Sequence, residues 1–318
     1  MQTYIIRRVF LFFPTLFIAS VVIFGIMRII PGDVARFLLG EDDQAYTQEQ
    51  LEDLRKHLGL SDPLHVQYGK WAWSMLSGKF GGKSLVDNEE ISELVSRRFP
   101  ISVQLTTLTL VIALSISLPL GVAAAVYQDR SPDYALRSVA ILGLAMPNFW
   151  VALLLIQFLV IVFHWSPPFV YTNIWEDPVH HLQMTIWPAL VLAWGYSSNL
   201  IRITRSSMLE VLRQDYVRTA HAKGLSSRSV IWTHALRNAL IPFVTQAGGH
   251  LGSLLGGTII LENIFAIPGL GQGVIQAATT NDYPVIQSLI MVLTFIVMGV
   301  NLLIDITYGI LDPRIGYR

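Results

Sequence analysis

Residues 215–242 read DYVRTAHAKGLSSRSVIWTHALRNALIP, and this stretch decides how the rest of the chain is interpreted. It is basic, it is rich in helix-forming residues, and it lies between two apolar segments. The pattern predicts two short amphipathic helices separated at Gly224, because glycine tolerates the backbone of a sharp turn. A loop of this size between apolar segments is expected to be a docking surface for a soluble partner.

The composition of the whole chain predicts a membrane protein. Of its 318 residues, 53% are hydrophobic and 14% are charged, and the mean hydropathy is +0.51. A spanning helix needs about 20 mostly apolar residues, and six segments approach this length. We therefore expect an all-α integral membrane fold with six transmembrane helices, at roughly 9–29, 101–126, 138–163, 182–201, 239–261 and 285–304.

The distribution of Lys and Arg predicts the orientation in the membrane. Residues 164–184 and 262–284 contain neither, whereas the N-terminus and the loop at 202–238 are basic. Because Lys and Arg concentrate in cytoplasmic loops, both termini are expected in the cytoplasm. Residues 31–100 form a segment long enough to cross regardless of charge. The first apolar run is too long for a cleaved secretory signal, so it is interpreted as the first span.

The predicted outer segment carries signals of soluble helices. Thr47 and Gln50 form a capping-box pattern that predicts a helix over 48–58, ended by Gly59. Pro63 is expected to open a second helix. These helices could be a cap over the spans or a contact for a partner, and both interpretations stay open. No cysteine is present, so no disulfide fastens them.

The stretch Ser77–Ser84 reads SGKFGGKS, one residue away from a phosphate-binding loop. Ser77 replaces the first glycine and no buried strand precedes it, so we expect a turn between helices instead. Elsewhere the chain shows no pattern for a nucleophile, a catalytic acid pair or a metal. His180 and His181 are interpreted as residues of an outer loop. The sequence therefore predicts no enzymatic activity, no cofactor and no metal on this chain.

Polar and small residues within the predicted spans are candidates for a translocation path. Each polar residue taken alone is better explained as an interhelical hydrogen bond, and Asp305 could pair with a loop arginine. In the fifth span glycines recur every four residues, with Gly249, Ser253 and Gly257 in a parallel row, which permits close helix packing or sliding. Pro147 and Pro188 are expected to break the third and fourth spans. The path or gate residues predicted on these grounds are Asn199, Gln246, Gly248, His250, Gly252, Gly256 and Asn301.

The segments YVRTAHAKGL at 216–225 and HALRNALIP at 234–242 resemble the cytoplasmic "EAA" loop of ABC importer permeases of the dipeptide/oligopeptide/nickel group. The resemblance extends over the chain and is closest to the B-type subunit. The wider superfamily has Glu at the position of Arg218, and Pro242 lies further from Gly224 than that pattern places it. The other matching segments are IPGD at 30–33, GKFG at 78–81, ENIFAIPGLG at 262–271, DYPVIQ at 282–287 and DPR at 312–314.

This resemblance implies a type I ABC importer transmembrane fold in a prokaryotic plasma membrane. It implies a first span with an outer helical segment over 1–96, a transmembrane domain over 97–312 and a tail over 313–318. The implied partners are a homologous second permease subunit, two cytoplasmic ATPase subunits that hold ATP and Mg, and an extracytoplasmic substrate-binding protein. The implied ATPase coupling residues are Tyr216, Val217, Arg218, Ala220, Lys223, Gly224, Leu225 and Arg228.

Two questions stay open from the sequence. The substrate could be a dipeptide, a longer peptide, a nickel chelate, glutathione or a sugar. The alternative function is a gradient-driven transporter or channel, which would need a membrane-embedded acid and often an internal repeat. No repeat is evident, and Asp305 is the single candidate acid, near the inner end of its span.

Overall fold

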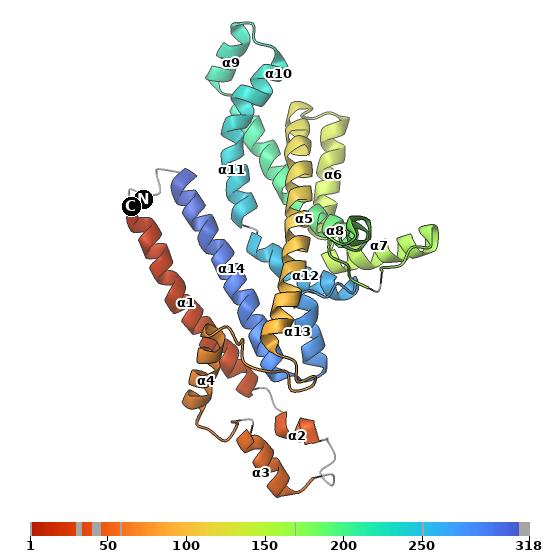
Figure 1. Cartoon of the computed structure of the whole chain (residues 1–318). Helices are drawn as coiled ribbons and strands as arrows, with labels where there is room; N and C mark the ends of the chain where they lie inside the picture. The colour runs from red at the N-terminus through yellow and green to blue at the C-terminus, as the bar shows by residue number, and fades with distance from the viewer. Residues whose placement is uncertain are drawn as a thin grey trace. The chain divides into compact units, whose positions relative to one another are not determined.

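The computed structural model describes residues 2–29, 34–39, 46–57, 59–168, 170–249 and 251–311 (Figure 1). Over these ranges the chain is helical and forms no strand, only an isolated bridge between Lys83 and Glu90. The all-α prediction is therefore confirmed. The elements are α1 (Gln2–Ile29), α2 (Val34–Leu39), α3 (Gln48–His57), α4 (Leu64–Leu76), α5 (Ile91–Val126), α6 (Ser131–Ala145), α7 (Asn148–Phe163), α8 (Pro178–Leu212), α9 (Asp215–Ala222), α10 (Ser227–Ser229), the π-helix η1 (Val230–Ala235), α11 (Leu236–Gly249), α12 (Leu251–Ile264), α13 (Leu270–Thr279) and α14 (Tyr283–Leu311).

Three predictions fall outside the described residues. They concern His250 and the segments IPGD at 30–33 and DPR at 312–314. The described chain divides into two compact units, which are treated separately. Unit 1 comprises Met1–Ser102 and Pro268–Arg318, and unit 2 comprises Val103–Ile267.

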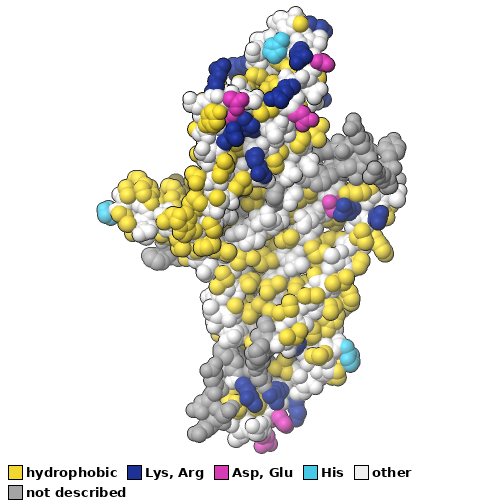
Figure 2. All heavy atoms as spheres, turned by 180° about the vertical axis from the view of Figure 1, so that it is seen from behind, with side chains coloured by type: hydrophobic (Ala, Val, Ile, Leu, Met, Phe, Trp, Pro, Cys, Tyr) yellow, Lys and Arg dark blue, Asp and Glu magenta, His cyan; other side chains and the backbone are white. Residues whose placement is uncertain are grey.

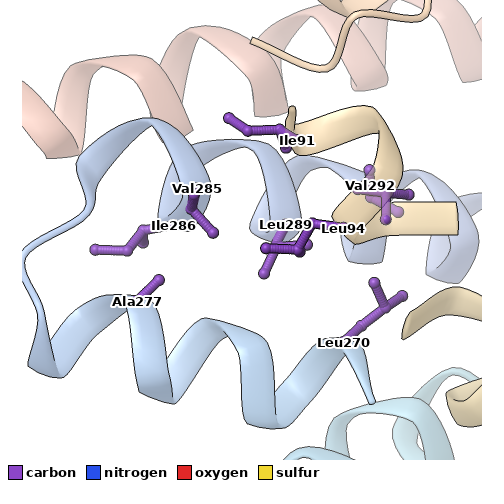
Figure 3. Packing of buried hydrophobic residues seen from close by; sticks show 9 residues of the cluster. Ile91, Leu94, Leu270, Ala277, Val285, Ile286, Leu289 and Val292 are labelled. Carbon is purple, nitrogen blue, oxygen red and sulfur yellow. The ribbon is translucent and has the colours of Figure 1, made fainter. Parts of the chain in front are cut away.

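Unit 1 is built around α14. Helices α1 and α13 both pack against α14, and the apolar core lies where α13 and α14 meet the start of α5 (Figure 3). Asp305 in α14 pairs with Arg8 in α1 at 2.9 Å, so its partner is an arginine of the first helix and not of a loop. The core residues are Ile91, Leu94, Val95, Leu270, Ala277, Val285, Ile286, Leu289 and Val292.

Unit 2 is built around α8, a helix of 35 residues. Helices α6, α7, α11 and α12 all pack against it. Its core joins side chains of α5, α8, α11 and α12, among them Ala113, Leu200 and Phe243. The hydroxyl of Tyr196 in α8 donates a hydrogen bond to the carbonyl of Ala247 in α11. Because so many neighbours cover it, α8 buries polar side chains that would be costly in lipid.

Among the described helices, α1, α5 and α14 are long and apolar enough to cross a membrane singly. Helices α6 and α7 also pass this test together, but they are bent by 107° where Met146 and Pro147 separate them. The predicted break at Pro147 is therefore confirmed. The predicted fifth span is divided between α11 and α12.

The predicted break at Pro188 is wrong, because Pro188 lies inside the unbroken helix α8. A proline removes one backbone hydrogen bond and crowds the preceding turn, which usually kinks a helix. Here Pro188 is buried among the neighbours that pack on α8, and Thr185 donates from its Oγ1 to the carbonyl of His181 at 2.8 Å. Tertiary packing thus keeps the helix continuous through the proline.

The loop interpretation of His180 and His181 is also wrong, because both residues lie in the first turn of α8. Asp177 caps that helix, and its Oδ1 accepts hydrogen bonds from the backbone of Val179 at 3.1 Å and His180 at 3.0 Å. Pro178 then occupies the first helical position. This Asp-Pro pair is a helix start signal, which sets the beginning of α8 earlier than the apolar run suggests.

The predicted helices before residue 77 are confirmed as α3 and α4. The capping box forms as expected: the backbone of Thr47 donates to Gln50 Oε1 at 2.9 Å, and that of Gln50 donates to Thr47 Oγ1 at 3.3 Å. Gly59 ends α3 with φ of +68°. Pro63 is the N-cap of α4 and not its first residue.

Candidate functional site

The loop from residue 213 to 238, here called the basic loop, begins with helix α9. Gly224 ends α9 with φ of +79°, and a Cβ added there would meet no atom within 4 Å. The backbone of Leu225 donates to the carbonyl of Ala220 at 3.3 Å, and that of Gly224 to the carbonyl of His221 at 2.9 Å. These two bonds form a Schellman motif. Backbone conformation, and not lack of space, therefore requires glycine at position 224.

The second helix of the basic loop is not short, in contrast to the prediction. Ser226 caps it, with its Oγ accepting from the backbone of Ser229 at 3.4 Å. From Ser227 the helix continues through η1 into α11 and reaches Gly249 without a break. A π-helical turn inserts one extra residue per turn and is frequent at functional sites. The basic loop is thus continuous with a helix of the core of unit 2.

The inner face of the basic loop is a small apolar cluster, which we call the loop base. Val217 and Ala220 of α9 are buried against Val230, which is 0% exposed, and Leu212 packs beside them. Val217 and Ala220, two of the implied coupling residues, therefore offer little surface to a partner. Their apolar surface is buried within the chain, where it holds α9 against the start of the second helix.

The outer face of the basic loop is polar and exposed. Arg218, Lys223 and Arg228 are all exposed, and Lys and Arg side chains gather at the end that carries α9 and α10 (top of Figure 2). Arg218 lies 3.6 Å from Asp215 in a largely exposed pair, which contributes little to stability. Tyr216 and Leu225 add apolar area, being 41% and 40% exposed. The phenol oxygen of Tyr216 accepts from Asn238 at 2.7 Å, which fixes its ring.

A buried ion pair between α6 and α8 was not predicted from the sequence. Arg205 in α8 donates from Nε and Nη2 to the two carboxylate oxygens of Asp133 in α6, both at 2.7 Å. Asp133 is fully buried and also accepts from the backbone of Asp129 at 3.0 Å. Planar two-bond pairing of this kind is strong and directional. This pair fastens the turn between α5 and α6 to α8. In the sequence, the sign of it is a single acidic residue in the first turn of α6.

Unit 2 also contains a cavity of about 750 Å³ next to α8. Two of the predicted path residues, Asn199 and Gln246, line it together with Asn148. Arg202, the one charged side chain among its described lining residues, donates from Nη2 to Asn199 Oδ1 at 3.0 Å. The remaining lining residues are Leu144, Leu192, Gly195, Tyr196, Ile203, Ser253, Leu254 and Gly257.

The other predicted path residues that the structure describes do not line this cavity. Gly248, Gly252 and Gly256 are absent from its lining, and Asn301 is exposed on α14 in unit 1. In the glycine-rich helix α12, the parallel row reaches the cavity instead, through Ser253 and Gly257. These two positions follow the same four-residue spacing, so one of the two rows noted in the sequence lines the cavity.

The two glycine rows of α12 have different surroundings. A Cβ added at Gly257 would lie 3.2 Å from Leu192 of α8, whereas one added at Gly256 would meet nothing within 4 Å. A Cβ at Gly195 would lie 2.8 Å from Asn148 Oδ1. Small residues at 195 and 257 therefore keep the wall of the cavity open inside unit 2. The face that carries Gly256 is exposed in this chain.

Comparison with known proteins gives concordant results. Residues 1–106 match the family described as binding-protein-dependent transport system membrane component, N-terminal, and residues 117–317 match the binding-protein-dependent transport system inner membrane component. The chain is 37% identical over 317 residues to a putative peptide transport system permease protein of Brucella suis, with 100% of both chains covered. It is 40% identical over 323 residues to the oligopeptide transport system permease protein AppB of Bacillus subtilis, and 36% identical over 318 residues to the glutathione transport system permease protein GsiC of Salmonella typhi, again with 100% of each chain covered.

Proposed function

The chain belongs to the family of binding-protein-dependent transport system inner membrane components, and we propose that it is the permease subunit of an ATP-driven importer that carries peptides or similar small solutes into the cytoplasm. Similar proteins named for peptide, oligopeptide and glutathione transport support this substrate class. The chain itself needs no catalytic site or cofactor in this proposal. ATP and Mg would bind to partner ATPase subunits.

The observation that carries the proposal is the two-sided construction of the basic loop. Its base is buried within the chain, while Arg218, Lys223 and Leu225 are exposed on its outer face. A patch that combines cations with an apolar centre suits a complementary protein surface, where charge guides the encounter and apolar contact supplies affinity. We assign this face to the ATPase subunits.

The same construction gives a route for movement. The helix that starts at Ser227 continues as α11, which packs against α8. Asn199 and Arg202 of α8 and Gln246 of α11 line the cavity of unit 2. A displacement of the loop by ATPase closure would therefore shift α11 against α8 and change the cavity. The π-helical turn η1 lies between the contact and the cavity, at the point where such a displacement would be absorbed or transmitted.

The proposed topology has six spans, both termini in the cytoplasm, and residues 31–100 outside. Supporting it are the segments 164–184 and 262–284, which contain no Lys or Arg. Because the chain lacks cysteine, single cysteines report orientation directly. With an impermeant thiol reagent on intact cells, Ser166→Cys and Thr280→Cys should react and Ser227→Cys should not. Labelling of Ser227→Cys from outside would invert the topology.

We further assign the open face of α12 to the homologous second permease subunit. Gly256→Leu has no neighbour to displace within this chain, whereas Gly257→Leu must move Leu192. Gly257→Leu is therefore expected to lower stability by about 1–3 kcal/mol. Gly256→Leu should leave the chain stable but weaken co-purification of the second subunit. Normal assembly and uptake with Gly256→Leu would show that this face does not meet a helix.

The proposed function is tested directly by asking whether ATP or an ion gradient drives uptake. Uptake of radiolabelled peptides by cells that contain the complete system should stop when cytoplasmic ATP is depleted with the proton gradient maintained. It should continue when the gradient is collapsed with ATP maintained. The reverse result would favour the gradient-driven alternative. ATPase subunits should also be recovered with the tagged full-length chain.

A further inference from the structure

A second cavity, of about 360 Å³, lies in unit 1 between the end of α1, α4, the glycine-rich turn after α4 and the first turn of α14. Its volume is in the range of small-ligand sites. The lining includes Arg28 of α1, Lys70 of α4 and Lys83 of the turn. None of the transport roles assigned above uses these residues.

Among the described residues, two of the three cations have no carboxylate partner. Lys70 pairs with Asp62 at 2.7 Å. Arg28 donates from Nε to Gln67 Oε1 at 3.1 Å and stacks over the ring of Phe24, but these partners are neutral. Within the described part of the chain, Lys83 forms no ion pair. The cavity therefore has a net positive wall formed by Arg28 and Lys83.

Buried donors add an independent indication of an anionic ligand. Gln287 of α14 is 5% exposed, lines the cavity, and leaves its Nε2 without a hydrogen-bond partner among the described residues. The indole Nε1 of Trp71, another lining residue, is buried and unpartnered in the same way. Both groups can only donate, so they match a ligand that offers acceptor oxygens.

The start of α14 forms another wall of the cavity. Tyr283 and Pro284 in the first turn of the helix and Gln287 in the next turn line it. Asp282, the residue before α14, already caps the helix, because its Oδ1 accepts from the backbone of Val285 at 3.5 Å. The same carboxylate accepts from Ser84 Oγ at 2.5 Å and from the backbone of Leu85 at 3.3 Å, which fixes the turn that presents Lys83.

The surroundings of the cavity point to a membrane surface. On α4, Trp73 is 72% exposed and Leu76 is 83% exposed. At the end of α1, the apolar side chains of Ile26 and Ile29 are exposed as well. Exposed apolar and aromatic side chains beside cations are typical of helices that lie at the level of lipid headgroups.

We propose that this cavity binds the phosphate group of an anionic lipid, with the acyl chains lying along the exposed apolar side chains of α1 and α4. Arg28, Lys83 and the donors of Gln287 and Trp71 recognise the phosphate oxygens. A lipid fits better than a soluble anion because the charged cavity opens beside apolar surface. The proposal goes beyond the transport function and does not depend on the substrate or on the ATPase partner.

The test uses the full-length chain in nanodiscs of phosphatidylcholine alone or of phosphatidylcholine and phosphatidylglycerol at a 3:1 ratio. The anionic lipid should raise the midpoint of thermal unfolding by mass action. Lys83→Gln should lower the apparent affinity for phosphatidylglycerol about fivefold. The matched control is Lys79→Gln, because Lys79 is exposed on the same turn but does not line the cavity.

Three results would overturn the proposal. The first is an equal midpoint in both lipid mixtures. The second is an equal loss of the lipid-dependent shift in Lys83→Gln and Lys79→Gln, which would indicate a general surface-charge effect. The third is a shift of the same size when inorganic phosphate is added to phosphatidylcholine nanodiscs, which would assign the cavity to a soluble anion.

Discussion

The pair α3–α4 and the basic loop follow the same local rules but are anchored differently. Gly59 and Gly224 end α3 and α9 with φ of +68° and +79°. In each case the backbone N–H of the residue after the glycine donates to a carbonyl five residues before it, which completes a Schellman motif. However, α4 is held to α1 by side chains: Tyr68 forms a hydrogen bond with Ser20 at 2.8 Å and meets the ring of Phe24 edge to face. Helix α9 instead packs on the helix that follows it. The comparison shows that α4 is fastened to a neighbouring helix, whereas α9 is fastened to a helix that continues into the core of unit 2.

The largest expected effect comes from breaking the anchor of the basic loop. Val230→Asp places a carboxylate in the fully buried loop base, where an uncompensated charge costs about 3–5 kcal/mol. The loop should open locally while α8 and α11 stay folded, and limited proteolysis should cut between residues 213 and 230. Recovery of ATPase subunits should fall in parallel.

The control is Thr233→Asp, because Thr233 is exposed in the same π-helical turn. It should leave the protease pattern and ATPase recovery unchanged. If Val230→Asp also leaves them unchanged, the loop base does not hold α9 in place.

A smaller effect on stability is expected from replacing the two glycines that end α3 and α9. Gly59→Ala and Gly224→Ala should each cost about 1–2 kcal/mol, because both positions have left-handed backbone and neither added Cβ meets a close neighbour. Hydrogen exchange at the amides of Leu60 and Leu225 should quicken to a similar extent. Gly69→Ala, inside α4 with open space around it, is the control and should not destabilise.

The functional consequences should differ even though the local costs are equal. Gly224→Ala should lower substrate-stimulated ATP hydrolysis, and Gly59→Ala should not. Equal loss of hydrolysis in the two variants would mean that the comparison between the segments is mistaken.

The sequence predicted the features that depend on local chemistry. The capping box at Thr47, the turn at Gly224 and the bend at Pro147 all follow from the conformational preferences of the residues present. The basic face of the loop was predicted because charge is visible without structure. These signals act within a few residues, so a single chain is enough to find them.

The features that the sequence did not predict depend on tertiary packing. Pro188 does not break α8 because neighbouring helices bury it, and Val217 and Ala220 turn inward because Val230 lies across from them. The cavity receives Ser253 and Gly257 because that row of α12 meets α8. The pairing of Asp133 with Arg205 joins residues 72 positions apart. No local pattern encodes such long-range choices.

The central claim is that the outer face of the basic loop couples this chain to ATP hydrolysis. The direct measurement is ATP hydrolysis by the reconstituted complex, stimulated by the substrate-loaded binding protein, in the double variant Arg218→Glu and Lys223→Glu. Its control, Lys56→Glu and Lys79→Glu, makes the same change in net charge on exposed residues of unit 1. We predict that the loop variant loses most of the stimulation, with its spans inserted and its unfolding midpoint unchanged, while the control keeps it. Wild-type stimulation and uptake in the loop variant would contradict the account.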